Sequence, residues 1–153
     1  MRGLYYLPFS LDGVDTVRTL VQIVPASTTA FELLRVHISQ NNSVASEQLE
    51  IEIGHTGVAN KGTVTNITPV TFYSGDVADV TAAGTGANAT VEPSSKFVSI
   101  REVFNTLSGY NHLPIPEERL PIRYPAWVLY IALNTTPASP LNLRGYVVFR
   151  AVD

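Results

Sequence analysis

The alternation of apolar and polar side chains over residues 31–53 is the feature that most constrains the fold of this chain. Successive side chains of a β-strand point to opposite faces, so an apolar residue at every second position predicts a strand with one buried face. The connector 40–46 is rich in Asn and Ser and separates two such runs. We therefore expect an antiparallel hairpin that turns Arg35, His37, Glu50 and Glu52 away from the core. Its buried face would carry six aliphatic side chains, each contributing about 1.5–3 kcal/mol: Leu34, Val36, Ile38, Leu49, Ile51 and Ile53.

Short apolar runs between turn signals continue along the chain, and no stretch of ten residues carries a helical period. Further strands are predicted over residues 4–9, 17–24, 70–73, 96–103, 126–133 and 143–152. The run 126–133 is apolar on both faces, as expected of a central strand that is covered from both sides. This pattern predicts an all-β fold: one domain over residues 1–153, built as an antiparallel β-sandwich or barrel of jelly-roll-like type.

Three segments depart from the pattern of short strands. Residues 1–10 are expected to form an extended N-terminal arm, and 75–95, with few large side chains, a long surface loop. Residues 111–125 contain four prolines, which fix φ and lack a ladder donor, and predict a semi-extended surface strap. Between these segments, residues 104–110 are expected to form one turn of helix.

Charged residues make up only 15% of the chain, and the net charge of −3 includes no basic cluster. Nucleic acid is therefore not an expected partner, because its binding depends on neutralising phosphates. A membrane span is not expected either, since the longest uncharged stretch, 124–143, contains three prolines. The N-terminal residues lack the long apolar run of a signal peptide. The absence of cysteine excludes disulfides and thiolate metal sites.

Residues capable of chemistry are present but do not form a recognisable motif. His37, His55 and His112 are far apart and lack paired metal-binding spacing. No serine lies in a G-x-S-x-G elbow. Lys61 precedes Gly62, the reverse of the order in a phosphate loop. We expect no catalytic residue, no metal and no cofactor, and we expect that the protein is not an enzyme.

Aromatic and basic side chains near the N-terminus and the proline-rich strap are the candidates for contact with a partner. Tyr, Trp and Arg are enriched at protein interfaces. The predicted subunit or capsid contacts are Tyr5, Tyr6, Phe9, Tyr110, His112, Arg119, Arg123, Tyr124 and Trp127. The aromatic residues of this set could equally well pack in the core of the domain, and the sequence does not decide between core packing and contact with a partner.

Several segments resemble small β-rich structural proteins of tailed bacteriophages. The resemblance rests on residues 34–40 followed by 47–51, on 101–105 leading to 113–119, and on 128–129 with 145–149. It covers most of the chain, although 54–95 is similar only in character. It implies a capsid decoration, or cement, protein that stabilises the head by binding across capsid subunits.

The same resemblance implies where such a protein works and with what. Its partners would be the major capsid protein and copies of itself, arranged as a homotrimer through a ring interface. It would be made in the host cytoplasm and would lie on the capsid exterior of the virion. The alternative is a tail, neck or receptor-binding component, including a carbohydrate-binding β-sandwich whose sugar site uses Tyr110, His112 and Trp127.

Overall fold

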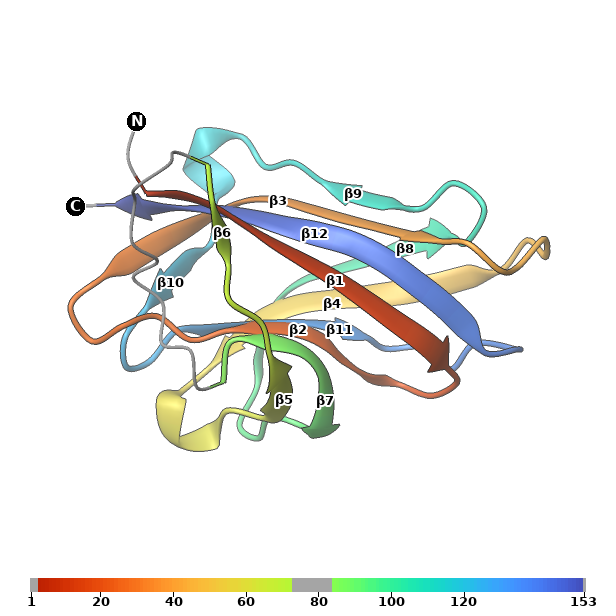
Figure 1. The fold of residues 1–153 in the computed structure, drawn as a ribbon, viewed down its shortest axis with the longest axis horizontal. Coiled ribbons are helices and arrows are strands. Elements are labelled where there is room, and N and C mark those ends of the chain that lie inside the picture. The colour runs from red at the N-terminus through yellow and green to blue at the C-terminus, as the bar shows by residue number, and fades with distance from the viewer. Residues whose placement is uncertain (1–2, 73–83, 153) are drawn as a thin grey trace.

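The computed structural model describes residues 3–72 and 84–152, which form two antiparallel six-stranded sheets packed face to face (Figure 1). Sheet A contains β1 (Leu4–Val14), β3 (Ala30–Gln40), β6 (Val70–Thr71), β9 (Tyr110–His112), β10 (Pro121–Arg123) and β12 (Leu141–Val152). Sheet B contains β2 (Arg18–Ile23), β4 (Gln48–Thr56), β5 (Thr63–Asn66), β7 (Gly86–Val91), β8 (Phe97–Asn105) and β11 (Val128–Leu133). The all-β sandwich is confirmed. The barrel alternative is wrong, because the two sheets of the described chain do not close on each other.

Most strands that follow one another along the chain lie in opposite sheets: β1 to β4 alternate between the sheets, and so do β10, β11 and β12. Sheet A has the order β1–β12–β3 followed by β9 and β10, and sheet B has the order β2–β11–β4–β8. This alternation between two sheets is the arrangement of a jelly roll. The hairpin expected over residues 31–53 is therefore wrong, since β3 pairs with β12 whereas β4 pairs with β11 and β8. Periodicity identifies the buried face of a strand and does not specify its neighbour across the ladder.

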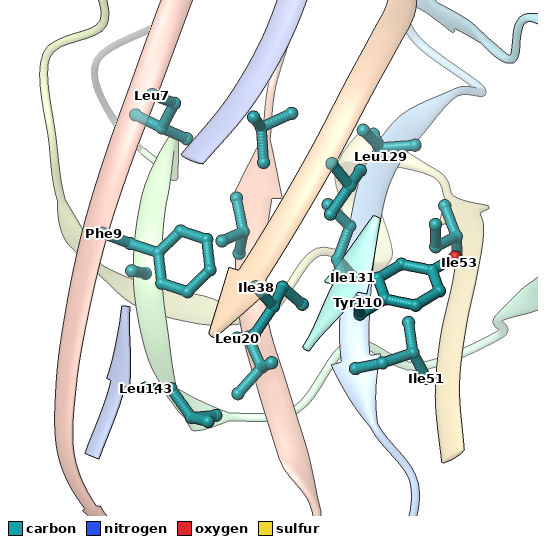
Figure 2. Packing of buried hydrophobic residues seen from close by; sticks show 14 of the residues in the cluster. Leu7, Phe9, Leu20, Ile38, Ile51, Ile53, Tyr110, Leu129, Ile131 and Leu143 are labelled. Carbon is teal, nitrogen blue, oxygen red and sulfur yellow. The ribbon is translucent and has the colours of Figure 1, made fainter. Parts of the chain in front are cut away.

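The core lies between the sheets. Figure 2 shows Leu7, Phe9 and Ile38 of sheet A packing in one cluster with Ile51 and Ile131 of sheet B. Five of the six aliphatic side chains that the alternation places inside are fully buried.

Leu34 is the exception among those six side chains. Arg35 pairs with Val148 and Leu33 with Phe149, so Leu34 is an extra residue in β3 and forms a β-bulge. The bulge turns Leu33 into the core and leaves Leu34 partly exposed.

The expected N-terminal arm is a strand of sheet A. β1 pairs with β12 from Leu4 to Leu11, and Tyr5, Leu7 and Phe9 point into the core. The alternation of these three residues with polar neighbours or proline is the pattern of a half-buried strand. Pro8 is tolerated because β6 pairs only with the start of β1, so β1 has one hydrogen-bonded neighbour at this point.

The remaining irregular segments are only partly as expected. Residues 111–125 include β9 and β10, which pair with β3 on either side of η2 (Pro116–Glu118), so they do not form a continuous strap. Residues 106–108 form a turn in place of the expected helix.

The segment between β4 and β8 contains η1 (Val58–Asn60) and three short strands. β5 and β7 extend sheet B beside β2, and β6 extends sheet A beside β1, on the side of the sandwich opposite β8 (Figure 1). The surface loop expected over 75–95 is therefore wrong where β7 lies, and its residues 75–83 lie outside the described part of the chain.

Candidate functional site

Three of the nine predicted contact residues lie in the core. Tyr5, Phe9 and Tyr110 are each no more than 5% exposed. Tyr5 packs on Phe31 and Phe149, with ring centroids 5.7 and 5.4 Å away. In this structure these aromatics complete the domain's own core.

His112 lies in the gap between the two sheets. Its Nδ1 is 3.7 Å from Oε1 of Glu102 on β8, and its Nε2 is buried without a hydrogen-bond partner among the described residues. Burial lowers the pKa of His112, and the carboxylates of Glu102 and Glu118 oppose that shift. Burial and the charge of Glu102 also raise the pKa of Tyr110. The cluster joins the edges of the two sheets.

The residues predicted at the end of the strap divide between two surfaces. Arg123 and Tyr124 line an open cavity of about 350 Å³ together with residues 27–30. Trp127 stacks on His55, with 3.4 Å between ring centroids, and the other neighbour of His55 is Phe97 at 5.1 Å. The sugar site expected from Tyr110, His112 and Trp127 is not assembled, because Tyr110 is buried in the core and Trp127 stacks on His55, whereas His112 contacts Glu102.

The β8 edge, defined by Phe97–Asn105, is the longest strand with one side unpaired along its whole length within residues 3–72 and 84–152. Among the described strands, β8 pairs with β4 alone along its nine residues. β1 likewise has only β12 as a neighbour beyond Tyr6, and the other edge strands, β5, β6, β9 and β10, have four residues or fewer. Phe97 and Val103 are 62% and 65% exposed, and Val98 is also exposed. An apolar edge strand offers free backbone donors and acceptors together with apolar side chains.

A groove crosses the outer face of sheet A, on the side away from the core. This outer-face groove has a volume of about 440 Å³, and its walls include Tyr6, Tyr146, Leu34, Val148 and Leu113. Two arginines, Arg35 and Arg119, also line it. The groove brings together Tyr6 and Arg119, which are more than a hundred residues apart in the sequence and are both among the predicted contact residues.

The outer face of sheet B carries a buried polar network. Tyr130 Oη donates a hydrogen bond of 2.7 Å to Oε1 of Glu52, and Arg101 Nε lies 3.4 Å from Oε2 of the same carboxylate. Lys96 Nζ lies 5.4 Å from the centroid of the Tyr130 ring. Glu52 points away from the core as expected, yet it is only 5% exposed because these side chains cover it.

The groove residues that sequence reasoning did not select are Tyr146, Arg35, Leu34, Leu113 and Val148. The alternation of Arg144, Tyr146, Val148 and Arg150 opposite the core residues of β12 is a detectable signal for a polar-aromatic outer face. The partners of that face could not be found, since they depend on the β3–β12 and β1–β12 pairings.

The described part of the chain contains no group of three or more His, Asp or Glu side chains arranged to hold a metal ion. Nor does any helix within residues 3–72 and 84–152 have the length and hydropathy needed to cross a membrane. Comparisons of the chain with protein-family models, curated proteins and solved structures return no match.

Proposed function

We propose that this protein is a structural component of a tailed-phage particle, a capsid decoration protein that works by docking and not by turnover. The observation that carries the proposal is the β8 edge, where a nine-residue strand leaves one side unpaired and exposes Phe97, Val98 and Val103 to solvent. Long apolar edge strands are normally protected in proteins that stay monomeric. In β8 the charged residues Arg101 and Glu102 and the bulge at Ser99 interrupt this apolar edge, yet Phe97, Val98 and Val103 remain in solvent, and in this proposal a partner covers them in the working assembly.

The neighbourhood of β8 extends this docking surface. The stack of Trp127, His55 and Phe97 continues the apolar surface at the start of the strand. Aromatic side chains that are anchored on one side and open on the other are typical binding hot spots. The jelly-roll arrangement itself recurs in viral capsid proteins and in lectins, so it is compatible with this role without specifying it.

Stabilising a capsid by decoration requires binding and no catalytic step. A protein that binds the assembled shell and not its dissociated subunits stabilises the shell by mass action, by about 2.7 kcal/mol per site at a free concentration of 100 times Kd. In the proposed arrangement, copies associate as a trimer on the capsid exterior, and each copy also contacts the major capsid protein.

The test is a comparison of two valine variants in binding to capsid shells of the virus that encodes the protein. Val103→Glu places a charge on the β8 edge, whereas Val44→Glu makes the same change on the connector between β3 and β4, where Val44 is 94% exposed. Both positions are exposed, so both variants should fold, as checked by circular dichroism and thermal unfolding.

We expect Val103→Glu to lose binding in a co-sedimentation assay and Val44→Glu to bind as the native protein does. Electron microscopy of decorated shells should show copies in numbers that match the local symmetry axes. Native-like binding by Val103→Glu, or only a handful of copies per particle, would overturn the proposal.

A receptor-binding or carbohydrate-binding component of the tail or neck is the second candidate. The outer-face groove favours it, because a concave site with tyrosine rings and arginines on a sheet face is suited to a small ligand.

A further inference from the structure

We propose that the outer-face groove is a binding site for a saccharide that carries a carboxylate group. In this assignment Arg35 and Arg119 bind the carboxylate, and the rings of Tyr6 and Tyr146 contact the apolar face of the sugar. The site is separate from the β8 edge, since the groove lies on sheet A and β8 belongs to sheet B. The assignment therefore stands whether or not the protein decorates a capsid.

The arginines of the groove carry more positive charge than their neighbours neutralise. Arg119 Nη1 bonds to Oε1 of Glu32 at 3.2 Å, and Arg150 Nε bonds to the same oxygen. A single carboxylate thus serves two guanidinium groups. Arg35 has no ion-pair partner among the described residues, and its one hydrogen bond is from Nε to Oδ1 of Asn111, at 3.0 Å. An anion is the complementary ligand.

The donors that remain are suitable for a carboxylate. The bond to Asn111 fixes the Arg35 side chain through Nε and leaves its two terminal amino groups unpaired within the described structure. Arg119 Nε is buried and has no partner in the part of the chain that is described. Guanidinium groups bind carboxylates through two parallel charge-assisted hydrogen bonds, which gives both strength and orientation.

The aromatic side chains of the groove are held in place before any ligand binds. The Tyr146 ring stacks on His37 with 5.4 Å between centroids, and the Arg35 guanidinium carbon lies 5.4 Å from the centroid of the Tyr146 ring. The Tyr6 ring centroid is 6.4 Å from that of Tyr146. Side chains whose positions are already fixed lose little entropy on binding, so the contacts they make contribute more to affinity.

The position of the groove favours a saccharide over a peptide. Peptides that dock on sheets commonly add a strand at an open edge and use its free backbone groups. The groove lies instead on the face of sheet A, where β12 pairs with both β1 and β3. Recognition there depends on side chains, and a volume of about 440 Å³ is within the usual range for small-ligand sites, roughly 300–1,000 Å³.

The test is isothermal titration calorimetry of the full chain with two pairs of defined probes. The acidic probes are 3′-sialyllactose and α-1,4-trigalacturonic acid, and their neutral counterparts are lactose and α-1,4-galactotriose. A blocked tripeptide, acetyl-Glu-Tyr-Glu-amide, tests the alternative of an acidic peptide. We expect at least one acidic saccharide to bind, at least tenfold more tightly than its neutral counterpart and than the peptide.

Three substitutions assign that binding to the groove. Arg35→Gln and Arg119→Gln should each weaken binding of the acidic saccharide at least tenfold, whereas Arg123→Gln, an exposed arginine outside the groove, should leave it unchanged. If Arg119→Gln fails to fold because it loses Glu32, Arg35→Gln carries the test, since Arg35 has no ion pair within the described residues to lose. Absence of binding by both acidic saccharides, preference for the peptide, or binding that survives Arg35→Gln would overturn the assignment.

Discussion

Replacing Tyr130 by phenylalanine removes one hydroxyl group from a fully buried position and leaves the ring in place. That hydroxyl donates the 2.7 Å hydrogen bond to the carboxylate of Glu52, which is itself 5% exposed. A hydrogen bond to a charged group contributes about 1.5–3 kcal/mol, and a buried acceptor that loses its donor recovers none of this from water. The remaining contact of Glu52, with Arg101 at 3.4 Å, is too long to compensate. We therefore expect Tyr130→Phe to lower the free energy of unfolding by about 1.5–3 kcal/mol.

The measurement is urea unfolding at pH 7, followed by the fluorescence of Trp127, with thermal unfolding as a second readout. For a domain of this size the expected decrease in Tm is roughly 3–12 °C, at about 2–4 °C per kcal/mol. Tyr124→Phe is the matched control, since the same hydroxyl is removed from a residue that is 44% exposed. It should change stability by less than about 0.5 kcal/mol.

Alkaline pH gives an independent readout of the same interaction. Burial, followed by the hydrogen bond to Glu52 and its charge, raises the pKa of Tyr130 above its usual value. The folded state therefore holds this proton more tightly than the unfolded state. The contribution of protonated Tyr130 to the free energy of unfolding is fully present below about pH 10 and is lost as the pH rises toward the raised pKa. Tyr130→Phe should reduce this alkaline loss, and Tyr110, whose pKa is also raised, should account for the rest. If Tyr130→Phe unfolds at the same urea concentration as the native protein, the energetic role given to this buried hydrogen bond is refuted.

Three further substitutions test the packing and the gap between the sheets. Gly145→Ala should lower the free energy of unfolding by about 1–3 kcal/mol in urea, because a methyl group at this position would clash with the carbonyl oxygen of His37. A variant as stable as the native protein would contradict the β3–β12 register. Phe149→Ala should cost about 3–5 kcal/mol, since its ring is fully buried against Tyr5 and Phe31, and a loss below 1 kcal/mol would be inconsistent with that packing. Burial lowers the pKa of His112, so the unfolded state binds the proton more tightly, and the free energy of unfolding should fall as the pH drops below about 6.5. His112→Gln should reduce this fall between about pH 7 and pH 5. If the pH dependence of stability is unchanged in the variant, the role given to His112 is refuted.

The buried faces of the strands were predictable from the sequence because side-chain burial follows a local period. Leu49, Ile51 and Ile53 enter the core as their alternation predicts, and β11 is buried along its whole length, as its uniformly apolar sequence indicates. The partners of these strands were not predictable, since β3 and β4, like β11 and β12, are neighbours in the sequence and lie in opposite sheets. The bulge at Leu34 was also missed, because one inserted residue shifts the period without changing the composition.

The candidate sites show the same division between local and long-range information. Tyr6 and Arg119 were selected as contact residues from their residue types alone, and the structure places both in the outer-face groove. Arg35 and Tyr146 were visible only as outward-facing residues of separate strands. They meet because β3 pairs with β12 across more than a hundred residues of sequence. The exposure of β8 was equally hidden, since an edge strand and a central strand of the same composition differ only in their neighbours.

The adjacency of β1 and β12 has a consequence for how the protein is made. β12 lies in the middle of sheet A, with β1 on one side and β3 on the other, and its last residues are tied to the start of β1 by the bond from Ala151 N to the Gly3 carbonyl oxygen. During translation, β1 and β3 leave the ribosome more than a hundred residues before the strand that joins them. Sheet A can therefore be completed only after β12 has emerged, because β12 is the strand that joins β1 to β3. Until then the apolar faces of β1 and β3 lack the strand that pairs with both, so they stay open to association with other chains for longer than the faces of a local hairpin would.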